Sequence, residues 1–319
     1  MLYPRPIHSL YALLLIAPLA IGQAAQPSST VAVTPFTFST AVNEVSLTFH
    51  AEDVHGNSIT DLKPGDLTIY DNLKEPRKVL VLQPLRNLPI RIGVLLDTSE
   101  SMSNTITLDR SVASTFIRNY FHPATDKAFV EFFGAASQIA QSWTNTPYAV
   151  INGIAGTISH SDVIGHSTAL FDTVYSACFY NFGKSQQPVS GNVILLFTDG
   201  VDNSSDMDLK SAVDMCQQSD TAVYAFYPHT TDEMSSGTKN LKLLTSQTGG
   251  DLFKLPESGA EAAASLKAIN ADLRNRYWLI YRPAILIHNG AFHHIYVGAT
   301  INNQAITIDA RAGYYAPDH

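Results

Sequence analysis

The sequence predicts an α/β protein, in which a doubly wound, mostly parallel sheet is inserted in a small β-sandwich. In the middle of the chain, continuous apolar runs alternate with apolar stripes at helical spacing, a pattern typical of βαβ units. Toward both ends, apolar and polar residues alternate instead, as in half-buried strands. The chain has 319 residues, of which 45% are apolar, so it is long enough for one large domain and a smaller one.

The first residues are predicted to be a secretory signal. Arg5 gives a positively charged start, residues 10–21 are an apolar run too short to span a bilayer, and Gly22 and Ala24 are the small residues that a signal peptidase reads. We therefore expect residues 1–24 to be a signal peptide that is cleaved after Ala24. The protein would be secreted or extracytoplasmic, with no transmembrane segment in the mature chain. An uncleaved N-terminal anchor helix is the alternative.

The next segments are predicted to form a linker and a β unit. Residues 25–39 are polar and rich in small residues, as in a linker, and residues 40–86 have the pattern of a small β unit. Within that unit, apolar residues alternate with polar ones from 45 to 51, and shorter strand-like segments follow at 67–69 and 79–82.

Residues 88–275 carry the pattern of the α/β domain. Strand-like apolar runs occupy 91–96, 128–133, 193–197 and 222–227, and helical stripes occupy 108–120, 170–178, 209–216 and 260–274. After this region the alternating β pattern returns at 277–281, 294–300 and 305–310. We therefore expect residues 276–319 to complete the N-terminal β unit, so that the two halves of that unit meet in space.

Charge and cysteine content exclude two classes of protein. Asp and Glu number 28 against 20 Lys and Arg, and the basic residues form no cluster, which excludes a nucleic-acid binder. The only two cysteines are too few for a disulfide scaffold. Cys178 and Cys216 lie on predicted helices that flank the same strand, so their thiols could meet. A disulfide and two buried thiols both remain open at this point.

Oxygen-bearing side chains follow two of the buried strands. Asp97, Ser99 and Ser101 form an Asp-x-Ser-x-Ser segment after the first strand, Asp199 precedes a glycine after the third, and Thr168 begins a helix between them. Ligands of open α/β sheets bind beyond the carboxyl ends of the strands. Hydroxyl and carboxylate oxygens are ligands that Mg²⁺ accepts, and Mn²⁺ or Ca²⁺ also prefers oxygen. The position left open suits an external carboxylate, which points to recognition of an acidic residue rather than to catalysis.

These residues resemble the von Willebrand factor type A (VWA) domain and its metal-ion-dependent adhesion site (MIDAS), whose motif is Asp-x-Ser-x-Ser, a distant Thr, then a distant Asp-Gly. Residues 241–250 look like the helix and Gly-Gly turn before the last strand of that family. The flanks at 54–71, 277–281 and 312–315 resemble a bacterial secreted family related to VWA. One departure is His166-Ser167, where small residues are commoner.

The resemblance implies a VWA, Rossmann-like fold and a function without enzymatic activity. The metal would be held by Asp97, Ser99, Ser101, Thr168 and Asp199. The implied partner is a protein that offers Asp or Glu, in cell adhesion or complex assembly. The sequence makes no prediction of the oligomeric state.

A hydrolase is the competing function. Residues 165–169 resemble the Gly-x-Ser-x-Gly nucleophile elbow, with Ser167 as the nucleophile, and a metal-activated water is a second hydrolytic possibility. The elbow requires a buried strand before it, whereas residues 159–162 are polar. His288, His293 and His294 are close in sequence, but neighbouring residues of a strand point to opposite faces. We therefore expect them to be exposed hairpin residues rather than a metal site.

Overall fold

The computed structural model describes residues 43–156, 167–183, 191–255 and 259–316, all of which belong to one compact unit. The predicted signal peptide and linker lie outside these residues. Within the described part of the chain, no helix is long and apolar enough to cross a membrane.

A six-stranded sheet forms the centre of the α/β region, in the order β6-β5-β4-β7-β8-β9. Its strands are β4 (Ile90–Asp97), β5 (Lys127–Phe133), β6 (Ser137–Thr144), β7 (Gly191–Phe197), β8 (Thr221–Tyr227) and β9 (Leu252–Lys254). All neighbours are parallel except β6, which runs antiparallel to β5. The chain moves from β4 to one edge and then returns to β7, which is the doubly wound order. The predicted α/β class with a mostly parallel sheet is confirmed.

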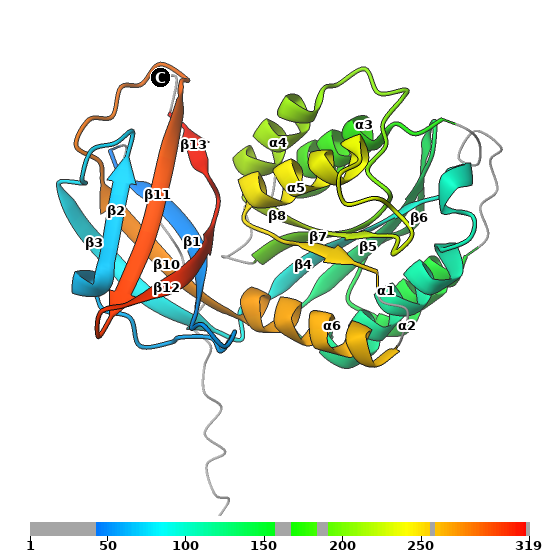
Figure 1. Ribbon diagram of the computed structural model, residues 1–319, viewed down its shortest axis with the longest axis horizontal. Coiled ribbons are helices and arrows are strands. Elements are labelled where there is room, and N and C mark those ends of the chain that lie inside the picture. The colour runs from blue at the N-terminus through cyan, green and yellow to red at the C-terminus, as the bar shows by residue number, and fades with distance from the viewer. Residues whose placement is uncertain (1–42, 157–166, 184–190, 256–258, 317–319) are drawn as a thin grey trace, which may run out of the picture. The chain divides into compact units, whose positions relative to one another are not determined.

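Helices cover both faces of this sheet (Figure 1). On one face lie α1 (Ile106–Tyr120), α2 (Pro147–Ala155) and α6 (Gly259–Arg274), and on the other lie α3 (Leu170–Ser176), α4 (Leu209–Gln218) and α5 (Ser236–Thr248). Successive strand residues point to opposite faces. Thus Val94 and Leu96 of β4 pack with the α1 side, while Leu95 packs with the α3 side. Burial on both faces explains why these strands appear as continuous apolar runs.

Two elements of the α/β region were not predicted. β6 is an edge strand whose side chains are all exposed or half-buried, so it has no apolar run. α2 is only nine residues long and begins at Pro147, the proline-tolerant first turn of a helix. Their signals are weaker than those of the buried strands and longer helices.

A second, seven-stranded sheet contains strands from both ends of the described chain. Its members are β1 (Val45–Glu52), β2 (Leu67–Asp71), β3 (Lys78–Arg86), β10 (Asn275–Arg282), β11 (Phe292–Ile301), β12 (Gln304–Ala310) and β13 (Gly313–Tyr315). β10 pairs antiparallel with both β1 and β3. The pairing gives one continuous sheet. The predicted two-layer β-sandwich and the predicted domain boundaries at 40–86, 88–275 and 276–319 stay predictions.

The chain passes from the seven-stranded sheet into the α/β region near Leu88 and returns to the sheet near Arg274, and these two residues are hydrogen-bonded to each other. The Leu88 amide donates to the Arg274 carbonyl (3.4 Å), and the Arg274 guanidinium donates to the Leu88 carbonyl (2.8 Å). The same guanidinium makes two hydrogen bonds to the Asp126 carboxylate, at 2.9 and 2.5 Å. Arg274 is 4% exposed and Asp126 is 1% exposed, so this is a buried ion pair.

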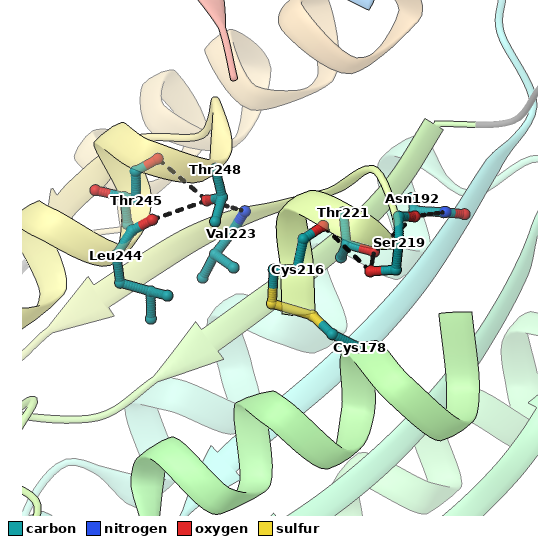
Figure 2. The surroundings of a disulfide bond; sticks show 9 residues. All are labelled: Cys178, Asn192, Cys216, Ser219, Thr221, Val223, Leu244, Thr245 and Thr248. Atoms are coloured by element: carbon teal, nitrogen blue, oxygen red, sulfur yellow. Dashed lines mark hydrogen bonds between the residues drawn. A yellow bond between two sulfur atoms is a disulfide. The ribbon is translucent and has the colours of Figure 1, made fainter. Parts of the chain in front are cut away.

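A disulfide joins the two cysteines (Figure 2). Cys216 lies on α4, and Cys178 lies on η4 (Ala177–Phe182), a π-helical turn that continues α3. Both residues are fully buried. Of the two possibilities that the sequence leaves open, the structure has the disulfide.

The prediction that His293 is exposed is wrong. His293 is buried, and its Nδ1 lies 2.9 Å from Asp71 Oδ1. The other carboxylate oxygen of Asp71 accepts hydrogen bonds from the hydroxyls of Tyr281 (2.8 Å) and Tyr314 (2.9 Å). His294, its neighbour on β11, is exposed. The alternation of the strand separates the two histidines, and the buried carboxylate explains which one points inward.

Candidate metal centre

The Asp-x-Ser-x-Ser segment and the Asp-Gly pair meet at one edge of the six-stranded sheet. Asp97 ends β4, and Asp199 is the second residue after the end of β7 at Phe197. β4 and β7 are parallel neighbours, with Leu96 opposite Phe197. The strand order reverses between these two strands, and the carboxyl ends of strands at such a reversal form the ligand crevice of doubly wound folds.

The side chain of Asp97 organises the loop that follows it. Asp97 Oδ1 accepts a hydrogen bond from the Ser99 amide (2.9 Å), and Oδ2 accepts one from the Thr198 hydroxyl (2.6 Å). The Ser99 and Ser101 hydroxyl oxygens lie 3.2 Å apart. Asp97 is fully buried, whereas Ser101 is exposed. The segment therefore presents two neighbouring hydroxyls above a buried carboxylate.

The turn after β5 holds Thr168 near this loop. The Phe133 carbonyl accepts from the Thr98 amide (2.8 Å), and the next carbonyl, that of Gly134, accepts from the Ala169 amide (2.7 Å). Thr98 and Ala169 therefore bind consecutive carbonyls of one turn. Since Thr168 precedes Ala169, the loop that follows Asp97 and the loop that carries Thr168 lie side by side.

Thr168 is also bonded to the loop that follows Asp199. Its amide donates to Asn203 Oδ1 (2.7 Å), and its carbonyl accepts from the amides of Asn203 (3.1 Å) and Ser204 (3.2 Å). The Thr168 side chain is buried. Hydrogen bonds thus connect the loops that carry all five predicted site residues.

Steric constraints explain why the residue after Asp199 is a glycine. Gly200 has a φ of +80°, and a Cβ there would lie 2.3 Å from the Gly237 carbonyl oxygen. Any other residue would be strained and would displace the start of α5. Asp199 Oδ1 accepts from the Val201 amide (3.0 Å), which closes the turn.

Two further carboxylates fix the loop after β7, and neither was predicted from the sequence. Asp202 Oδ2 accepts from the Phe171 amide (2.9 Å) and the Ser205 hydroxyl (2.5 Å). Asp172 accepts from the amides of Asp206 (3.0 Å) and Met207 (2.7 Å). Both attach this loop to the first turn of α3, directly after Thr168. The excess of Asp between 199 and 208 was the available signal for Asp202, and Asp172 has no comparable signal.

Burial and like charge act on Asp97. Burial is the larger effect and the nearby charge of Asp199 the smaller, and together they raise the pKa of Asp97 to about 6 despite its hydrogen bonds from Thr198 and Ser99. A cation bound here would offset the negative charge of Asp199 that acts on Asp97. This electrostatic environment fits the predicted donor set.

Asp109, in the first turn of α1, is a third carboxylate that was not predicted from the sequence. Its side chain is 1% exposed, and neither oxygen has a hydrogen-bond partner. Burial is the largest effect on Asp109 and raises its pKa to about 7; the nearby Thr105 side chain lowers the pKa, and the charge of Asp97 adds a smaller increase. Asp109 shares its helix stripe with the buried Val112 and Phe116, so an acidic residue at an apolar position was the available signal.

The donor set is rich in hydroxyls. Among the described residues, no group of three or more His, Cys, Asp or Glu is placed to hold a metal ion. The predicted set of three hydroxyls and two carboxylates would be a different kind of site, one of oxygen donors that would suit Mg²⁺, Mn²⁺ or Ca²⁺. Of the hydrolase features, Ser167 is half-buried, and the segment 159–162 and His166 lie outside the described residues.

No family model matches the chain, and no curated protein matches it. Solved structures similar to it include a von Willebrand factor type A protein from Catenulispora acidiphila, at 11% identity and a TM-score of 0.44, covering 79% of this chain and 73% of that one. Mussel proximal thread matrix protein 1, with a zinc-occupied MIDAS motif, has 13% identity and a TM-score of 0.48 over 63% of this chain. The conserved hypothetical protein BatB from Bacteroides thetaiotaomicron has 14% identity and a TM-score of 0.44, covering 56% of this chain and 97% of that one. This chain spans about half the length of the mussel protein, 48% in one crystal form.

Proposed function

We propose that this protein, which contains a VWA domain, is exported and binds a protein ligand through a divalent cation. Ser99, Ser101 and Thr168 would supply hydroxyl ligands, and Asp97 and Asp199 would supply negative charge. We propose Mg²⁺ as the ion, with Mn²⁺ and Ca²⁺ as the other oxygen-preferring candidates. The proposed VWA region is 88–275.

One observation carries this proposal: hydrogen bonds connect the loops of all five residues at the strand reversal between β4 and β7. Thr198 reaches Asp97 from the end of β7, and Thr168 is bonded to the loop after Asp199. Such links hold the donors in place before a ligand arrives, which lowers the cost of ordering them on binding.

The roles of the residues follow from their surroundings. Asp97 is buried and already accepts two hydrogen bonds, so it is suited to orient the Ser99 amide and to contribute charge. Ser101 is exposed, so a partner could reach its hydroxyl. When bound, the cation would supply a positive centre that an Asp or Glu of the partner completes. No group in this arrangement needs to transfer a proton, so we propose a binding protein and not an enzyme.

Calorimetry with Mg²⁺ alone tests the metal site. We expect the wild type to bind Mg²⁺ and Asp97→Ala to lose measurable binding. Asp232→Ala is the matched control, because Asp232 is an exposed carboxylate in the loop after β8, at the same edge of the sheet. Equal binding by the wild type and Asp97→Ala would refute the proposed site.

Two further measurements address export and the competing hydrolase. The N-terminus of the exported protein is expected at Ala25, and an intact N-terminus would indicate an anchor instead. We expect no esterase activity from the purified wild type. If the wild type does have esterase activity and Ser167→Ala abolishes it, the hydrolase is favoured. A crosslinked pull-down with and without chelator would identify the protein ligand.

A further inference from the structure

We propose that one end of the seven-stranded sheet binds the surface of a membrane that contains anionic lipid. This loop tip consists of residues 72–78, which lead from β2 into β3, and residues 283–291, which connect β10 to β11. Its exposed apolar side chains enter the interface of the bilayer, and its basic side chains bind the lipid phosphates. This role is separate from that of the proposed cation site.

Leu73 has a backbone conformation that favours glycine. The Lys74 amide donates to the Asp71 carbonyl (3.0 Å) and the Asp71 amide to the Lys74 carbonyl (2.9 Å), so Asn72 and Leu73 are the central residues of a tight turn. Their φ angles are +46° and +65°, and in such turns glycine is the usual second central residue. Leu73 is nevertheless 94% exposed, so no packing offsets the strain. A strained, fully exposed leucine points to a role outside the fold.

Two exposed isoleucines lie beside this turn. Ile285 and Ile287 are exposed, whereas Leu286 between them packs against the core of the seven-stranded sheet. Both isoleucines line one cavity of about 270 Å³ together with Lys74, the residue after Leu73. The loop tip therefore gathers three large apolar side chains in contact with water, and exposed apolar groups of this kind mark interaction sites.

The loop tip is basic, although the chain as a whole is acidic. Among residues 74–78, three basic residues and one acidic residue give a local charge of +2, against −8 for the whole chain. Lys74, Arg77 and Lys78 are all exposed. Positive charge beside exposed apolar side chains is the combination that binds anionic lipid. The same charge disfavours contact between the loop tips of two copies of the chain, because like charges would meet.

Arg77 is held where the two segments of the loop tip meet. Its Nε donates to the Ala284 carbonyl (3.1 Å), and its amide donates to the Arg282 carbonyl (2.8 Å). Arg77 and Arg282 both line a cavity of about 480 Å³. The charge of Arg282 is offset by Glu44, which accepts a hydrogen bond from it at 3.1 Å. Since guanidinium groups bind phosphate through paired hydrogen bonds, Arg77 is suited to hold a lipid phosphate beside the apolar side chains.

Cosedimentation with vesicles tests the proposal. The exported form of the chain is mixed with vesicles of phosphatidylcholine alone, or of equal parts phosphatidylcholine and phosphatidylglycerol. A chelator is present, so that the proposed cation site cannot bridge the protein to phosphate. We expect the wild type to bind the anionic vesicles more tightly and to lose this binding as the salt concentration rises. Lys74→Gln should weaken binding to the anionic vesicles about fivefold and leave binding to phosphatidylcholine unchanged.

Two variants test the apolar side chains. Leu73→Gly removes the exposed side chain and also relieves the strained backbone, so it should not destabilise the fold. We expect it to bind the anionic vesicles about 10-fold more weakly than the wild type, and Ile287→Ser to do the same. Ile139→Ser is the matched control, because it makes the same substitution at an exposed isoleucine of β6, in the other sheet. We expect this control to bind like the wild type.

Several outcomes would overturn membrane binding by the loop tip. One is binding by both Leu73→Gly and Ile287→Ser within twofold of the wild type. Another is equal binding of the wild type to the two kinds of vesicle, or the same weakening in Ile139→Ser. A wild-type dimer in analytical ultracentrifugation that Leu73→Gly dissociates would make a second copy of the chain the occupant instead. All these proteins share one N-terminus, so residues 1–24 cannot cause a difference between them.

Discussion

In metal-free protein, Asp109→Asn should remove a pH-dependent loss of stability. Burial raises the pKa of Asp109 from 3.8 to about 7. The unfolded chain releases this proton near pH 4, whereas the folded protein keeps it until about pH 7. Between these values the folded state binds more protons, so its free energy of unfolding falls as the pH rises. Asn has no such proton.

The magnitude follows from the size of the shift. From pH 5 to pH 8, about two pH units lie below the folded pKa, and each unit is worth about 1.4 kcal/mol, so the wild type loses about 3 kcal/mol at this residue. A buried Asn amide without a partner carries a cost of its own, but that cost does not change with pH. The predicted quantity is therefore the difference in pH dependence between the two proteins.

Urea unfolding in the presence of a chelator, at pH 5 and pH 8, measures this difference. The free energy of unfolding of Asp109→Asn, relative to the wild type, should be about 3 kcal/mol higher at pH 8 than at pH 5. Asp206→Asn is the control, because it makes the same substitution at an exposed aspartate. Parallel pH profiles for the wild type and Asp109→Asn would refute the reasoning.

Three further predictions concern stability. Replacing Cys178 and Cys216 by Ser should lower the free energy of unfolding by about 4 kcal/mol, since the bond spans 38 residues; two reactive thiols in denatured, unreduced protein would contradict it. Arg274→Leu should cost about 3–5 kcal/mol in urea unfolding because it leaves Asp126 buried without its cation, and a loss below 1 kcal/mol would be evidence against this pair. Tyr281→Phe removes one hydrogen bond to a buried carboxylate and should cost about 1–3 kcal/mol at neutral pH, whereas an unchanged unfolding midpoint would show that the bond contributes nothing.

The sequence predicted those strands whose environment leaves a clear pattern. β4 and β7 are buried on both faces, which requires continuous apolar residues, so their positions could be inferred within a few residues. β6 was missed because an edge strand can be half-exposed and polar. His293 was misassigned because its burial depends on Asp71, which lies 222 residues away in sequence.

The same distinction applies to the candidate site. The five site residues could be proposed from the sequence alone, because their spacing and their positions after predicted strands form a pattern. They are Asp97, Ser99, Ser101, Thr168 and Asp199. Asp109 was not predicted, because a single acidic residue on an apolar stripe has the same sequence signal whether or not a partner satisfies it. The contacts of Asp202 depend on the path of a loop, which no periodicity describes.

The hydrogen bonds between Leu88 and Arg274 have a consequence for folding order. β3 and β10 are antiparallel neighbours, yet the whole α/β region separates them along the chain, so pairing them in an unfolded chain would carry a large loop-closure entropy. Once the α/β region folds, its own entry and exit are bonded together, and the remaining loop is only a few residues long. We therefore expect β3 and β10 to pair after the α/β region has folded. The folded region would then connect the two strands as a short turn connects the strands of a β-hairpin.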